Sequence, residues 1–418
     1  MTPARHRAAP GRPDRTPQDK PDMARSASLL ACVPLRPHVP ALPPLPRRAG
    51  ALAPSALARA ALVLAVLAPG AAQAHVKWFC AYDVASQPLA LGSVVTRAFM
   101  VLVLVSVAGL WAGTLLSRSG VGASMARMLD LAGHAVRDRI EAMMRAAYAT
   151  FFVCLSTLGG LILTPELFTT ASWVPWLQGA IAACLLFRAT LVPAALGMVV
   201  LFATGIRDYG LFHMMDYPIF LGAALYFALL GLQGRGAAGH QVSPSGRVLP
   251  PRGLAAWPAR AWAAWDSLGL RPVDVLRWAA AITLMWASVE KWAYPEWTYP
   301  LLLTHTHMTM GLAPDFYMTA AGLVEFGLAF ALVCAPLVSR LSAVVLTALF
   351  TSAILEFGRI DAIGHLPIIV ILVAIVADNR TARAPRAGLV PVGYAAALVG
   401  VVGLYYGVHL ALFGAGVA

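Results

Sequence analysis

Ionisable side chains lie inside or beside apolar segments in the C-terminal half of the chain: Glu290, Lys291, Glu325, Glu356 and His365. A charge within lipid costs about 3 kcal/mol or more unless it is paired or faces a water-filled cavity. We therefore predict that these side chains point inward, toward one another, and form a catalytic or ligand-binding pocket. The alternative interpretation is a structural network, in which ion pairs only hold the helices in register.

A second group of residues has the chemistry of a metal site. The stretch "THTHMTMG" contains His305, His307, Met308 and Met310. Imidazole and thioether ligands together suit copper, above all Cu(I). A chain processed to begin at His75 would add a free amine and an imidazole, which resembles the copper-binding N-terminus of histidine-brace proteins. The alternative is that the histidines are solvated and that the methionines only fill gaps in the packing.

Composition predicts the elements that must position these groups. Hydrophobic residues make up 59% of the 418 residues and charged residues 12%, and the mean hydropathy is +0.73. A soluble globule of this length could not bury that much apolar surface, so the expected fold class is an all-α polytopic membrane protein with the lipid bilayer as its solvent. The net charge of +12 comes largely from arginines in an N-terminal tail and in short loops, as in proteins that retain positive loops in the cytoplasm. We therefore expect no nucleic-acid partner.

The first part of the chain has the pattern of a targeting region. Residues 1–50 are rich in Pro and Arg and are predicted to be a disordered basic tail. Residues 51–74 combine a basic flank, a short apolar run and small residues, which is typical of a signal peptide cleaved after Ala74. Residues 75–116 would then form a periplasmic N-terminus and a first span. This predicts a protein of the bacterial inner (plasma) membrane whose mature N-terminus is periplasmic.

Apolar runs predict about ten spans. They lie near residues 93–116, 147–163, 174–188, 189–207, 217–233, 273–293, 316–336, 339–357, 364–378 and 389–413. They divide the chain into a degenerate module at 117–233, a cytoplasmic linker at 234–272, a second module at 273–380 and a last span within 381–418.

The two modules are predicted to be an internal repeat. Residues 201–219 align with residues 349–368, and Arg145 and Ser156 recur at the same interval as Arg277 and Ser288. In the same alignment Gln178 takes the place of Glu325. Because both stretches would cross the membrane in the same direction, this indicates two parallel four-helix modules with one flanking helix at each end. The alternative is chance, since Leu, Phe and Ile are common in any span.

The second module also resembles a known family. Its "WASVEKW", "AAGLVEFGLAFALV" and "EFGRIDAIGHLPI" segments resemble those of the DoxX-like four-helix membrane proteins, over residues 273–380 directly and over 145–233 through the repeat. That resemblance implies a redox-linked membrane role, associated with quinol, thiosulfate or thiol chemistry. It supplies no set of catalytic residues.

Three functions follow from these patterns. The preferred one is a quinone- or quinol-linked membrane subunit that works with a membrane or periplasmic oxidoreductase. The second is a periplasm-facing copper-binding or copper-transport protein, and the third is a non-catalytic assembly scaffold. Quinone and copper are thus the candidate cofactors, and the sequence leaves open whether the protein is an enzyme.

Overall fold

The computed structural model describes residues 76–128, 139–238, 241–242, 248–249, 257–378 and 386–414. The predicted tail at 1–50, the predicted signal peptide at 51–74 and His75 lie outside the described residues.

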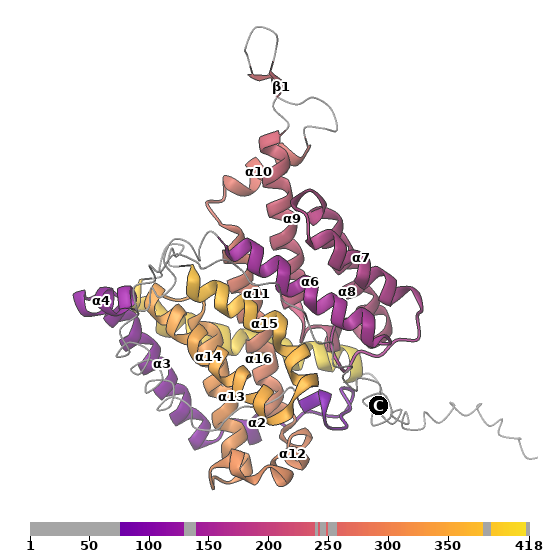
Figure 1. Ribbon diagram of the computed structural model, residues 1–418. Coiled ribbons are helices and arrows are strands. Elements are labelled where there is room, and N and C mark those ends of the chain that lie inside the picture. The colour runs from indigo at the N-terminus through magenta and orange to yellow at the C-terminus, as the bar shows by residue number, and fades with distance from the viewer. Residues whose placement is uncertain are drawn as a thin grey trace, which may run out of the picture. The chain divides into compact units, whose positions relative to one another are not determined.

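The described chain is nearly all helical, as its composition predicts, and each predicted apolar run contains one long helix (Figure 1). These helices are α3 (Arg97–Ser117), α6 (Ile140–Leu158), α7 (Trp173–Leu185), α8 (Leu191–Met214), α9 (Pro218–Ala238), α11 (Pro272–Ala293), α13 (Pro314–Ala331), α14 (Pro336–Phe357), α15 (Arg359–Ala377) and α16 (Val390–Phe413). Short helices lie between them: α2 (Leu91–Val94), α4 (Gly120–Met128), α10 (Trp257–Asp266), α12 (Tyr299–Thr304), η2 (Val76–Trp78), η3 (Arg188–Thr190), η5 (Pro295–Trp297), η6 (Thr306–Thr309) and η7 (Ala387–Leu389). Two short strands, β1 (Gln241–Val242) and β2 (Val248–Leu249), pair antiparallel.

Five helices of the described chain are long and apolar enough to cross a membrane. They cover Arg97–Ser117, Arg188–Met214, Pro336–Phe357, Arg359–Ala377 and Ala387–Phe413, and two shorter apolar helices cover Trp173–Leu185 and Pro218–Gln233. Helix α11 is long as well, but it carries both acidic and basic side chains, which lowers its hydropathy. The apolar helices give the chain the character of an integral membrane protein in contact with lipid.

The long helices pack in two consecutive groups. Helices α6, α7, α8 and α9, here the first helix set, contact one another in chain order, and α11, α13, α14 and α15, the second helix set, do the same. The first and last helices of each set form the junction: α9 packs on α11, and α6 packs on α15 (Figure 1). Helices α3 and α16 contact each other and the second set. At the α9–α11 junction Gly222 allows close approach, because a Cβ there would lie 2.1 Å from the Cβ of Ala279.

The segment before α3 crosses the junction as an ordered piece of chain, which we call the N-terminal strap (residues 76–90). The backbone N–H of Leu89 donates to the carbonyl of Ala293 at 2.9 Å. The hydroxyl of Tyr294 donates to the carbonyl of Ser86 at 3.0 Å, and that of Tyr406 donates to the carbonyl of Leu89 at 2.8 Å. These bonds tie the strap to the end of α11 and to α16.

Candidate functional site

Lys77 of the N-terminal strap lies at the centre of a buried polar cluster. Its side chain is fully buried, and its ammonium group forms ion pairs with both Asp216 and Glu290. Asp216 lies in the turn between α8 and α9, whereas Glu290 lies in the last turns of α11. One ammonium group on the strap therefore connects the two helix sets.

Aromatic side chains hold the strap in this position. The ring of Trp78 lies directly on the backbone of Gly364 in α15, where an added Cβ would be only 2.0 Å from the indole. Only glycine leaves room for this contact. The same indole ring is 4.8 Å from the ring of His365, and Phe79 lies 5.2 Å from Phe357.

Burial and charge act in opposite directions on this cluster. Burial alone would lower the pKa of Lys77, but the charges of Asp216 and Glu290 outweigh it and raise the pKa above its ordinary value. The ammonium group is therefore charged at every physiological pH. Burial also raises the pKa of Asp216, against the opposing attraction of Lys77. Two buried carboxyl groups therefore share one ammonium group.

A second buried group adjoins Asp216. Nε2 of His213 lies 2.8 Å from Oε1 of Glu166, and the hydroxyl of Tyr217 donates to the same oxygen. Gly210, with a φ of +84°, interrupts α8 and turns its last residues away from the helix axis. This break places His213 opposite Glu166, which belongs to the loop between α6 and α7.

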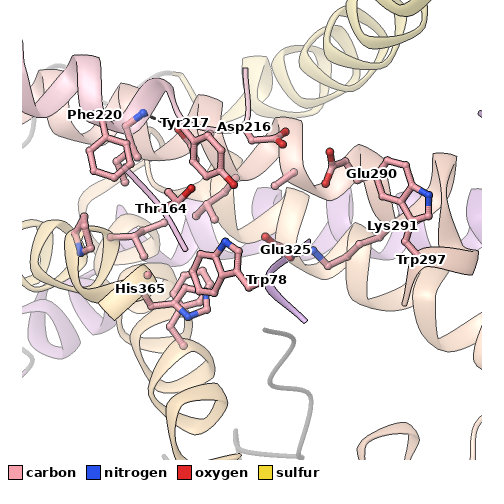
Figure 2. Close-up of a pocket in the computed structure, with 18 of the residues that line it drawn as sticks. Trp78, Thr164, Asp216, Tyr217, Phe220, Glu290, Lys291, Trp297, Glu325 and His365 are labelled. Atoms are coloured by element: carbon pink, nitrogen blue, oxygen red, sulfur yellow. Dashed lines mark hydrogen bonds and ion pairs between the residues drawn. The ribbon is translucent and has the colours of Figure 1, made fainter. Parts of the chain in front are cut away.

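A cavity of about 90 Å³ opens beside the cluster, between the two helix sets (Figure 2). It brings together Glu290, Lys291, Glu325 and His365, which are four of the residues predicted from the sequence to share a pocket. Its other walls include the side chains of Trp78, Asp216, Tyr217, Phe220, Trp297 and Phe350. Carboxylates and an imidazole thus face one small space with aromatic walls.

The cavity contains two paired groups that differ in exposure. Nζ of Lys291 lies 2.7 Å from Oε2 of Glu325, and each side chain is 17% exposed; Figure 2 shows the two pointing toward each other. Nδ1 of His365 lies 2.9 Å from Oδ2 of Asp361, whose side chain is completely buried. The carboxylate orients the imidazole so that Nε2 is the atom available to a ligand.

Glu356 is absent from the residues that line the cavity. Its Oε1 lies 3.6 Å from Nε2 of His305 and 3.3 Å from Nε2 of His307. Glu356, which was predicted for the pocket, therefore contacts His305 and His307, which were predicted to bind copper.

The two methionines predicted as copper ligands differ in exposure. Met308 is buried against Leu302, Tyr317 and Met318, whereas Met310 is 50% exposed. His75 belongs to the residues that the structure does not describe, so copper binding stays a prediction.

Sequence reasoning placed Glu290, Lys291, Glu325 and His365 together but left Lys77, Glu166, His213 and Asp216 out of the site. A signal existed for three of these four residues. Glu166 belongs to a "PE" dipeptide that recurs at Glu296, and His213 and Asp216 flank the methionines of "HMMD". Lys77 carried no signal, because its partners are 139 and 213 residues away in the chain.

Comparison with known proteins adds no further information about this site. No protein-family model, curated protein or solved structure matches the chain. The fold and the site together define an integral membrane protein of helical type with a buried cluster of ionisable side chains.

Proposed function

We propose that this protein binds the ring of a quinol-type redox ligand in the cavity between its helix sets and accepts the protons that the ligand releases. The observation that supports this proposal is the convergence of Glu290, Lys291, Glu325 and His365 on one cavity with aromatic walls. Oxidation of a quinol to a quinone releases two protons and two electrons. His365, held by Asp361, and the carboxylate of Glu325 would take the protons, and a partner oxidoreductase in or on the membrane would take the electrons.

The size of the cavity bears on how such a ring would enter. Its volume of about 90 Å³ suits a few water molecules, whereas a cavity that accepts benzene measures about 150 Å³. The indole of Trp78 already fills the adjoining slot against Gly364 and His365. A ligand ring would therefore enter by displacing Trp78 or by parting the Lys291–Glu325 pair at the cavity wall.

The DoxX-like resemblance and the duplication belong to the same proposal. In a duplicated pair of modules related by a twofold axis, the first helix of each would meet the last helix of the other, and the α6–α15 and α9–α11 contacts have this form. The repeated arginines agree with it. Nε of Arg145 donates to the carbonyl of Leu185 at the end of α7, and Arg277 donates to Ser339, whose hydroxyl donates to the carbonyl of Leu332 just after α13.

The proposal also assigns an orientation. The strap, the turn that carries Asp216 and the loop that carries His305 would lie on the periplasmic side of the inner membrane. The arginines of the opposite loops support this orientation, because cytoplasmic loops retain basic residues.

The test measures the binding of a water-soluble quinol analogue to the full chain in detergent. Quenching of tryptophan fluorescence reports the binding. We expect saturable binding, weakened by about tenfold or more in Glu325→Gln and in His365→Gln, since each removes a proton acceptor from the cavity. Glu356→Gln is the matched control and should bind as the parent does, because Glu356 does not line the cavity. Absence of binding by the parent protein would overturn the proposal.

A further inference from the structure

We propose that Glu166, His213 and Asp216 bind a divalent transition-metal ion. Each of these buried residues offers one ligand atom, and the three atoms all lie within 4.8 Å of one another. They come from the first helix set and lie beside the cavity, which Asp216 helps to line. The proposal is separate from the binding of a quinol and does not depend on it.

The donor set fits a particular group of ions. One imidazole with two carboxylates is a ligand set of Zn²⁺, Mn²⁺ and Fe²⁺, with metal–ligand distances of about 2.0 to 2.2 Å. Ligand atoms on one such ion lie up to roughly 4 Å apart, so the three atoms need to move inward by less than an ångström. The interruption of α8 at Gly210 brings His213 and Asp216 within reach of Glu166 from another loop.

The cluster is rich in carboxyl groups that could bind a cation. Glu166, Asp216 and Glu290 bring three carboxyl groups to the buried region, and within the described residues the ammonium group of Lys77 interacts electrostatically with all three. A buried net charge is strongly unfavourable. A bound divalent ion would favour the ionised form of its carboxylate ligands and would compensate their charge.

A buried lone pair on Asp216 supports the same conclusion. Lys77 contacts its Oδ2, whereas its Oδ1 is buried and has no hydrogen-bond partner within the part of the chain that the structure describes. A carboxylate that bridges an ammonium group and a metal ion would use both oxygens. Tyr217, which donates to Glu166, and Tyr82, whose ring lies 5.5 Å from that of His213, would surround and orient the ligands.

The experiment is elemental analysis of the full-length protein, purified in detergent with an affinity tag that contains no histidine. We expect about one equivalent of zinc, manganese or iron per chain, and a cobalt-loaded sample should show the visible absorption bands of protein-bound Co²⁺. His213→Ala and Glu166→Gln should each lower the affinity for Zn²⁺ by at least about tenfold. Glu166→Gln preserves the shape of the side chain, so its folding can be checked by size-exclusion chromatography.

The double variant His305→Ala with His307→Ala is the matched control. It removes two imidazoles outside the cluster and should retain both the ion and the cobalt spectrum. Loss of the ion in this control, with retention in His213→Ala, would show a surface ion only and would overturn the proposal. A parent protein that stays metal-free after loading with Zn²⁺ and Mn²⁺ would overturn it as well, whatever the outcome of the quinol experiment.

Discussion

The two helix sets differ in how they use buried polar side chains. Gln178 of α7 is fully buried, and its amide nitrogen donates to the carbonyls of Leu161 and Ile162 at 2.7 and 2.9 Å. The position that corresponds to Gln178 in the predicted repeat is Glu325 of α13, which pairs instead with Lys291 at the cavity wall. The first set thus fixes a loop with a neutral amide, whereas the second places a charged pair where a ligand could meet it.

The histidine–carboxylate pairs differ in the same way. His213 meets Glu166 from a loop 47 residues away, and the pair lies in a buried cluster. His365 meets Asp361 one helical turn earlier on the same helix, and its ring lines the cavity. His213 is thus held by a residue distant in the chain, whereas His365 is held by a residue of its own helix and lines the cavity.

The largest effect is expected where the two sets are joined. Lys77→Met removes the shared ammonium group and leaves Asp216 and Glu290 buried without their counter-charge. Loss of one partner of a buried ion pair costs about 3 to 5 kcal/mol, so the midpoint of thermal unfolding in detergent should fall strongly. Arg207→Ala is the control, because Arg207 pairs with its neighbour Asp208 on the surface, and it should leave the midpoint unchanged.

Gly364→Ala is expected to have the next largest effect. The added methyl group would clash with the indole of Trp78 at 2.0 Å, so the strap must shift. Overpacking of this kind costs about 1 to 3 kcal/mol, which thermal unfolding would measure. Gly403→Ala on α16 meets no atom within 4 Å and is the matched control. Equal stability of the two variants would count against the docking of Trp78 on α15.

Gln178→Glu tests the difference between the helix sets by a change in the first set. The new carboxylate loses both amide donors and faces the carbonyls of Leu161 and Ile162, at a cost of about 1 to 3 kcal/mol. The reverse change, Glu325→Gln, should cost less than about 1 kcal/mol, because the Lys291–Glu325 pair is partly exposed. Equal losses of stability in Gln178→Glu and Glu325→Gln would show that the two helix sets do not differ in this way.

Much of the helical framework follows from local sequence, but the buried cluster around Lys77 does not. Each predicted apolar run contains a helix because hydropathy and turn residues are local signals. The pairing of the strap with both helix sets is different, since the partners of Lys77 are distant in the chain and no periodicity marks the contact. We expected charged side chains in apolar segments to converge, and Glu290, Lys291, Glu325 and His365 do line one cavity. Glu356 does not line that cavity, because it lies at the end of α14, where it contacts His305 and His307.

A double-mutant cycle between Lys77 and Glu290, measured by thermal unfolding in detergent, tests whether the ammonium group of the strap joins the two helix sets. Removal of the carboxylate relieves the uncompensated charge that Lys77→Met creates. We expect Lys77→Met with Glu290→Gln to be more stable than Lys77→Met alone. Strictly additive losses in the double variant would show that the strap does not join the two helix sets through this ion pair.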